Sequence, residues 1–155
     1  MSETFRLRFR IPSKLSAMAT VRHKLEKFIA ASSLDLGEDA SLEVTLALDE
    51  ATSNSVRHAY CDEDGNAREG FIDVEYAQEE EDLLIRLWDD GNPCDRISMV
   101  GLPHSTPGES GMGSAMIRSI MSEVRFERTK DGRNLLEMRR RPGGSTWSFA
   151  DMTGE

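Results

Sequence analysis

One stretch decides the fold: residues 46–60, which read LALDEATSNSVRHAY. Its Ala, Leu, Glu and Arg residues favour a helix, and neither Gly nor Pro interrupts it. Glu50 and Asn54 are four positions apart, so they share one face of that helix, one turn apart. Leu42 and Leu46 extend the same stripe towards the N-terminus, on a face that we expect to be core.

An acid and an amide at the end of an apolar stripe are costly to bury without partners. The economical explanation is that Glu50 and Asn54 border a cavity and bind something in it. A carboxylate and an amide oxygen are hard donors, which suit Mg²⁺ and can orient a hydroxyl group or a water. The alternative, a polar helix face with accidental spacing, stays open on this stretch alone.

Composition excludes several classes of protein. The chain has 155 residues, of which 38% are hydrophobic and 30% charged, as expected for one globular domain. Its net charge of -9 argues against nucleic acid binding, which needs clustered Lys and Arg, but permits binding of a nucleotide. No apolar run is long enough to span a membrane and the N-terminus lacks a signal-peptide pattern, so we expect a cytoplasmic protein.

Periodicity along the chain predicts an α+β fold. Alternating or apolar runs predict strands over residues 4–11, 70–77, 83–88, 124–128 and 134–139. Helical patterns cover residues 14–31, 38–60 and 114–122, the first with Ser13 as a candidate N-cap. Helices set against a mostly antiparallel mixed sheet make a two-layer α/β sandwich. We expect one domain over residues 1–141, followed by a C-terminal extension, 142–155, with a short strand at most and a loose end.

Three further segments lie between these elements. The acidic run 78–82 reads as a solvated hairpin turn rather than a metal site, and 129–133 reads as a second hairpin. Residues 95–110, rich in Gly, Pro and small polar residues, form a loop too long to be a simple connection. Such loops are usually functional or mobile.

Two short motifs could carry chemistry. Asp89-Asp90-Gly91 ends a strand, where a carboxylate can accept a hydrogen bond from an exocyclic amine and Gly91 leaves room for a flat ring. Gly111-Met112-Gly113 precedes a helix, whose free N–H groups can bind an anion. Each motif alone is equally an ordinary turn or loop. The chain has no P-loop, no dinucleotide fingerprint, no zinc-ligand spacing and no GxSxG elbow.

The order of these motifs is more specific than any one of them. A Glu-x-x-x-Asn helix, an Asp-x-Gly strand end and a Gly-x-Gly helix resemble the N, G1 and G2 boxes of the GHKL (Bergerat-fold) ATP-binding superfamily. Within it, Asp49-Glu50-Ala51 with Asn54 and His58-Ala59-Tyr60 is similar to the anti-sigma factor serine kinase branch. Ser110-Gly-Met-Gly113 followed by Ile-Met-Ser-Glu-Val at 120–124 resembles the same branch.

The resemblance implies a role for each site residue. Asn54 would ligate the Mg²⁺ on the ATP phosphates, and Glu50 would be the general base for a substrate hydroxyl. Asp89 would bind the adenine amine, with Gly91 beneath the ring. Backbone around the phosphates would come from Ser110, Gly111, Met112 and Gly113, and residues 97–110 would be the ATP lid. Arg22, on the first helix, would contact a protein partner.

The implied function is partner switching by a protein serine/threonine kinase. Such a kinase phosphorylates a STAS-domain anti-sigma-factor antagonist and sequesters a sigma factor or another regulator. Departures from the family pattern at Ser114, Cys94, Arg133 and the shorter lid keep open an alternative, an ATP-binding switch with little kinase activity. A sensor histidine kinase domain fits less well because its N box generally lacks the Glu. Relatives commonly form homodimers, and the strand with Phe5, Leu7 and Phe9 offers an apolar surface.

Overall fold

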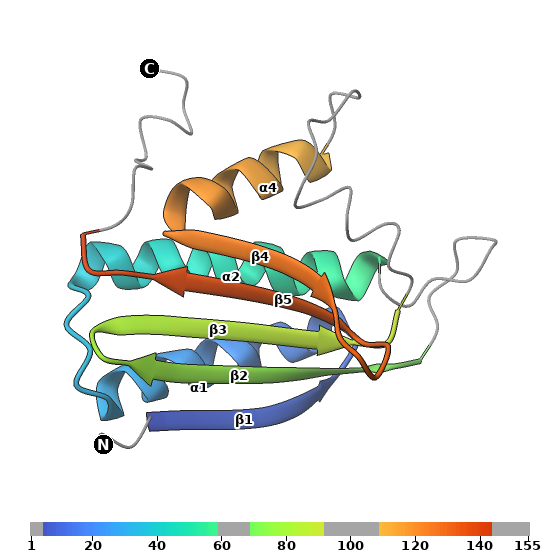
Figure 1. Ribbon diagram of the computed structural model, residues 1–155, viewed down its shortest axis with the longest axis horizontal. Coiled ribbons are helices and arrows are strands. Elements are labelled where there is room, and N and C mark those ends of the chain that lie inside the picture. Colours follow the sequence, from blue (N-terminus) through green and yellow to red (C-terminus); the bar gives the residue numbers. More distant parts are fainter. Residues whose placement is uncertain (1–4, 59–68, 92–108, 144–155) are drawn as a thin grey trace.

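A computed structural model of the chain describes residues 5–58, 69–91 and 109–143. In these ranges helices cover one face of a five-stranded sheet with strand order β1-β2-β3-β5-β4 (Figure 1). The elements are β1 (Phe5–Pro12), a 3-10 turn η1 (Leu15–Ala17), α1 (Met18–Ala31), α2 (Glu38–His58), β2 (Phe71–Glu79), β3 (Asp82–Asp89), α4 (Glu109–Ile120), β4 (Glu123–Arg128) and β5 (Asn134–Arg140). Every pairing among the described strands is antiparallel. The predicted two-layer α+β fold is confirmed.

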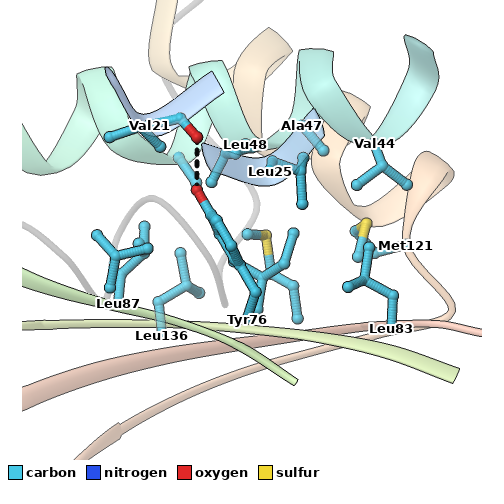
Figure 2. Packing of buried hydrophobic residues seen from close by; sticks show 14 of the residues in the cluster. Val21, Leu25, Val44, Ala47, Leu48, Tyr76, Leu83, Leu87, Met121 and Leu136 are labelled. Carbon is cyan, nitrogen blue, oxygen red and sulfur yellow. Dashed lines mark hydrogen bonds between the residues drawn. The ribbon is translucent and has the colours of Figure 1, made fainter. Parts of the chain in front are cut away.

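The core lies between the sheet and the helices. Alternate residues of the central strands point towards the helices and are fully buried, as the period of two requires. Tyr76 of β2 reaches across this layer, and its hydroxyl donates a hydrogen bond of 2.7 Å to the Val21 carbonyl of α1 (Figure 2). Burial raises the pKa of the Tyr76 hydroxyl far above its ordinary value. The neutral phenol therefore ties α1 to the sheet.

The buried stripe of α2 differs from the predicted one. Its apolar core residues are Val44, Ala47, Leu48 and Ala51. Leu42 is 55% exposed, so its predicted place in the core is wrong. The reason is helical geometry: Leu42 lies two positions before Val44, which is about 200° around the helix.

The start of the first helix also differs from prediction. Ser13 is not an N-cap, because its buried hydroxyl has no hydrogen-bond partner and α1 begins only at Met18. The Ser13 N–H instead donates to the Gly70 carbonyl at 2.9 Å, continuing the β1–β2 pairing past Pro12. The chain therefore leaves the sheet two residues later than expected, after Ser13, and enters α1 through the 3-10 turn.

Both predicted hairpins are present. The acidic run turns at Glu80, whose φ is 58°, and joins β2 to β3. The second hairpin joins β4 to β5 with Gly132 at φ 84°, in the left-handed region that glycine tolerates. The predicted C-terminal extension lies outside the described residues from position 144 onward.

The face of the sheet opposite the helices carries ion pairs. Arg86 of β3 contacts Glu75 of β2 and Glu137 of β5, each at 2.7 Å. Alternate arginines of β1 join this layer, since Arg10 pairs with Asp73 at 2.8 Å and Arg8 lies over the Trp88 ring. None of the described helices is long and apolar enough to cross a membrane.

Candidate functional site

The predicted acid and amide of α2 lie where the helix emerges from the core. Asn54 is 4% exposed and borders the buried stripe, whereas the Glu50 side chain is 25% exposed. The difference follows from their angular positions, because Glu50 is farther around the helix from Val44 than Asn54 is. The structure therefore places one buried amide beside one accessible carboxylate.

Arg57 joins these two groups, and sequence reasoning missed it. Its Nη2 donates a hydrogen bond of 3.0 Å to Asn54 Oδ1 and lies 3.8 Å from Glu50 Oε1. A guanidinium only donates, so the amide atom that faces it must be oxygen. The i, i+4, i+7 spacing of Glu50, Asn54 and Arg57 was a signal that could have revealed this set, which we name the α2 cluster.

The α2 cluster fits a hard divalent cation. A positive group already lies against the Asn54 amide oxygen and near the Glu50 carboxylate. Both oxygen types are ligands that Mg²⁺ accepts, and Mg²⁺ commonly takes only one or two protein ligands and completes its shell with phosphates and waters. The donor set is therefore consistent with the predicted metal ligand, Asn54.

Asp89 ends β3 in a fully buried position. Its Oδ1 accepts hydrogen bonds of 2.9 Å from the Gly91 N–H and from Nδ2 of Asn134. The same Asn134 nitrogen donates to the Gly91 carbonyl at 2.9 Å. Both predicted residues of the Asp-x-Gly motif are thus held in one conformation by a third residue, Asn134, that was not predicted.

Arg128 completes this arrangement from β4. Its Nη1 donates to Asn134 Oδ1 at 3.0 Å, which fixes the orientation of the amide and aims its nitrogen at Asp89. The β3–β5 and β4–β5 registers pair Asn134 with both Asp89 and Arg128. We call Asp89, Gly91, Arg128 and Asn134 the strand-end network. In the sequence, Asn134 could have been noticed only as a polar residue at the start of a strand, directly after the turn of a hairpin.

The α4 helix begins earlier than predicted. It starts at Glu109 rather than at residue 114, so Ser110, Gly111, Met112 and Gly113 lie in its first turns. Glycines disfavour a helix, which is why the sequence predicts a start only after Gly113. The side chains of residues 109–114 and the predicted lid up to residue 108 lie outside the described part of the chain.

These pieces meet at one end of the molecule. Figure 1 places the C-terminal end of α2, the C-terminal end of β3 and the start of α4 at the same end of the sandwich. The three predicted motifs, far apart in sequence, therefore lie at one end of the fold. A ligand bound there would meet buried hydrogen-bonding groups of the sheet, an acidic helix face and a helix N-terminus.

Arg22, the predicted partner residue, lies on the exposed side of α1. Its Nε is 3.5 Å from Asp49 Oδ1, and its side chain is 46% exposed. Burial raises the pKa of Asp49, and the charge of Arg22 opposes that shift. Asp49 immediately precedes Glu50, so this pair connects the α1 surface to the α2 cluster.

Comparison with known proteins identifies relatives of this chain. Residues 11–140 match the family described as the Histidine kinase-like ATPase domain. The anti-sigma F factor of Clostridium novyi (strain NT) is 31% identical over 110 residues, covering 68% of this chain and 74% of that protein.

A solved structure shares the fold. The RsbU and RsbW domains of a Mycobacterium tuberculosis protein match with a TM-score of 0.60 and 21% identity over 88% of this chain. The chain spans about a third of that longer protein, 32%, so this likeness speaks for the fold alone. The matched family and the identity to the anti-sigma F factor cover most of the chain, and the chain therefore belongs to the histidine kinase-like ATPase domain family, in the branch that contains the anti-sigma F factor.

Proposed function

We propose that this chain is a protein serine/threonine kinase of a partner-switching pathway. It transfers phosphate from ATP to a STAS-domain anti-sigma-factor antagonist and sequesters a sigma factor or an equivalent regulator. Membership of the ATPase family and the identity to an anti-sigma F factor support the nucleotide and the pathway. The observation that carries the kinase assignment is an accessible carboxylate, Glu50, one helical turn from the buried amide of Asn54.

The strand-end network is suited to adenine. Asp89 presents a carboxylate that the Gly91 N–H and the Asn134 amide hold in place, so it can accept a hydrogen bond from the exocyclic amine without reorganising. A charged acceptor rewards a donor at that position and penalises the carbonyl that guanine has there. Gly91 would lie beneath the ring, where it adds no side chain.

The phosphate end lies between α2 and α4. Asn54 holds Mg²⁺ through its amide oxygen, and the backbone of Ser110, Gly111, Met112 and Gly113 surrounds the phosphates. The ion held by Asn54 would supply positive charge close to the phosphates during transfer.

Glu50 provides the acid–base step. Its carboxylate accepts the proton of the substrate serine or threonine hydroxyl as that oxygen approaches the terminal phosphate. A base in this role must be reachable by a protein substrate, and the exposed fraction of Glu50 satisfies that requirement. Arg22, on the adjoining face of α1, contacts the protein partner.

A second candidate is an ATP-dependent clamp that sequesters its partner without phosphorylating anything. Its support is the set of departures from the family pattern, among them Ser114 after Gly-x-Gly and Cys94 near the end of the Asp-x-Gly box. Such a clamp would bind Mg-ATP but would give no transfer to any STAS-domain protein. Homodimer formation is compatible with both functions.

The test is phosphate transfer from radiolabelled ATP to STAS-domain proteins encoded in the same genome. Replacing Glu50 by Gln keeps the shape and removes the base, so the transfer rate should fall by about 10²–10⁴-fold while ATP affinity stays within about two-fold. Glu38→Gln makes the same change in the first turn of α2 and should leave the rate unchanged. A Glu50→Gln rate within a few-fold of the parent would remove Glu50 from the role of base.

A further inference from the structure

One nitrogen of Arg57 lies among three oxygens of α2. Nη2 is 3.0 Å from Asn54 Oδ1, 3.3 Å from Ser53 Oγ and 3.8 Å from Glu50 Oε1. The Nε atom of the same guanidinium donates to the Ser53 carbonyl at 3.4 Å. Side chains on a helix lean towards its N-terminus, so an arginine at position 57 reaches back over the two preceding turns.

The hydrogen bond from Arg57 occupies the Asn54 oxygen that is also the proposed metal ligand. The proposed function assigns the Asn54 amide oxygen to Mg²⁺, and in the structure this oxygen accepts a charge-assisted hydrogen bond from Arg57. Mg²⁺ coordinates at about 2.0–2.1 Å and demands regular octahedral geometry. A guanidinium nitrogen within hydrogen-bonding distance of the same oxygen would crowd that shell and repel the cation.

Arg57 has room to move away, whereas Asn54 does not. The Arg57 side chain is 44% exposed, and the contacts described above join it to groups of its own helix. Asn54 is buried at the edge of the core stripe, so its amide keeps its place. The metal therefore meets a fixed oxygen and a displaceable cation.

We propose that Arg57 is a built-in counter-cation, which holds the Asn54 amide oxygen and the Glu50 carboxylate in the metal-free chain and gives way when Mg²⁺ binds. This inference rests on the proposed function, and it adds a residue that controls how strongly nucleotide binding depends on the metal. Because the two cations exclude each other, the free energy of the Arg57 contact is subtracted from metal binding.

The test measures nucleotide binding rather than catalysis. ATP affinity is determined by calorimetry in excess Mg²⁺ and again in EDTA, and the ratio of the two dissociation constants gives the contribution of the metal. Arg57→Gln should increase this ratio by about five-fold, the upper range for a partly exposed ion pair. Arg57→Lys keeps a cation and should stay within about two-fold of the parent. Lys27→Gln, on the exposed side of α1, removes the same charge elsewhere and should change nothing.

The outcomes separate this inference from the proposed function. An unchanged or smaller ratio in Arg57→Gln would overturn the inference, because Arg57 would then not compete with the metal. If the parent transfers phosphate but Arg57→Gln leaves the ratio of the two dissociation constants unchanged, the kinase assignment stands and the role of Arg57 is refuted. An increased ratio in a chain that phosphorylates no STAS-domain protein would support Arg57 and refute the kinase assignment.

Discussion

The α2 cluster and the strand-end network hold polar groups in opposite ways. The α2 cluster takes all its members from one helix, keeps Glu50 and Arg57 partly exposed, and is joined by contacts of the Arg57 guanidinium. The strand-end network draws on three strands, is buried at Asp89 and Asn134, and is closed by short hydrogen bonds. The comparison teaches that one region is partly exposed and formed by local contacts, whereas the other is buried and held by contacts between strands.

This division suits the two ends of a nucleotide. In the proposed function the adenine is recognised by shape and hydrogen bonds, which a buried network provides with little reorganisation. In the same proposal the phosphates arrive with a metal and one of them is transferred, so the groups around them must exchange partners. If the division is right, substitution of Asn54 or Arg57 in the α2 cluster should affect ligand binding more than stability, and substitutions in the strand-end network should affect both.

The largest expected effect is that of Asn54→Ala on binding. The substitution removes the proposed metal ligand, so affinity for Mg-ATP should fall by at least about 100-fold, since even groups that only support a ligand cost 10–100-fold. Calorimetry measures the affinity, and circular dichroism checks that the variant is folded. Thr45→Ala is a suitable control, because that hydroxyl bonds only to the Ser41 carbonyl of the same helix among the contacts that the structure describes. Micromolar Mg-ATP affinity in Asn54→Ala would contradict the site.

Asn134→Ala should damage stability and binding together. It removes the donor to Asp89 and Gly91, leaves buried acceptors without their partner, and should lower the free energy of unfolding by about 2 kcal/mol. Urea denaturation measures this, and ATP affinity should fall in the same variant. Gln78→Ala removes an exposed amide that also makes three hydrogen bonds, and should cost no more than about 0.5 kcal/mol. If Asn134→Ala and Gln78→Ala lose the same free energy of unfolding, the strand-end network contributes no more to stability than an exposed set of hydrogen bonds.

A smaller effect concerns the hairpin that carries Asn134. Asp73 contacts Arg133 of this hairpin at 2.8 Å, and the hydrogen bond from Arg10, followed by that from Arg133, lowers the pKa of Asp73 below its ordinary value of 3.8. A lowered pKa in an acid means that its contribution to stability is present above pH 3.8 and is lost as the pH falls through the lowered value.

Unfolding measured against pH checks this contribution. Asp73→Asn should be less stable than the parent at neutral pH, and the two curves should converge in acid. Asp90→Asn breaks a more exposed contact of the same arginine and should cost less than about 1 kcal/mol at any pH. If the free energies of unfolding of the parent and of Asp73→Asn differ by the same amount down to strong acid, the ion pair between Asp73 and Arg133 does not stabilise the hairpin.

The sequence predicts the α2 cluster better than the strand-end network, for a physical reason. Glu50 and Asn54 are related by helical spacing, which can be read locally, and Arg57 could have been found in the same way. Asn134 lies 45 positions from Asp89, and only the β3–β5 register brings them together. Tertiary pairing of this kind leaves no periodic signal in one sequence.

Element boundaries were the other weak point. The predicted elements exist, but Ser13 stays with the sheet, Leu42 turns to solvent and α4 begins at Glu109. Each difference arises where two local preferences compete and packing against the rest of the chain decides. These differences do not affect the predicted order of the three motifs, because that order depends on which elements exist and not on the residue at which each begins.

The most direct test of a single site with two unlike ends is an NMR titration of the ¹⁵N-labelled chain with Mg-ATP. We expect the Gly91 amide, the Asn134 side-chain amide and the amides of residues 50–57 to shift together, with one common dissociation constant. Shifts confined to either the α2 cluster or the strand-end network, or two different dissociation constants, would contradict the assignment of both regions to one nucleotide.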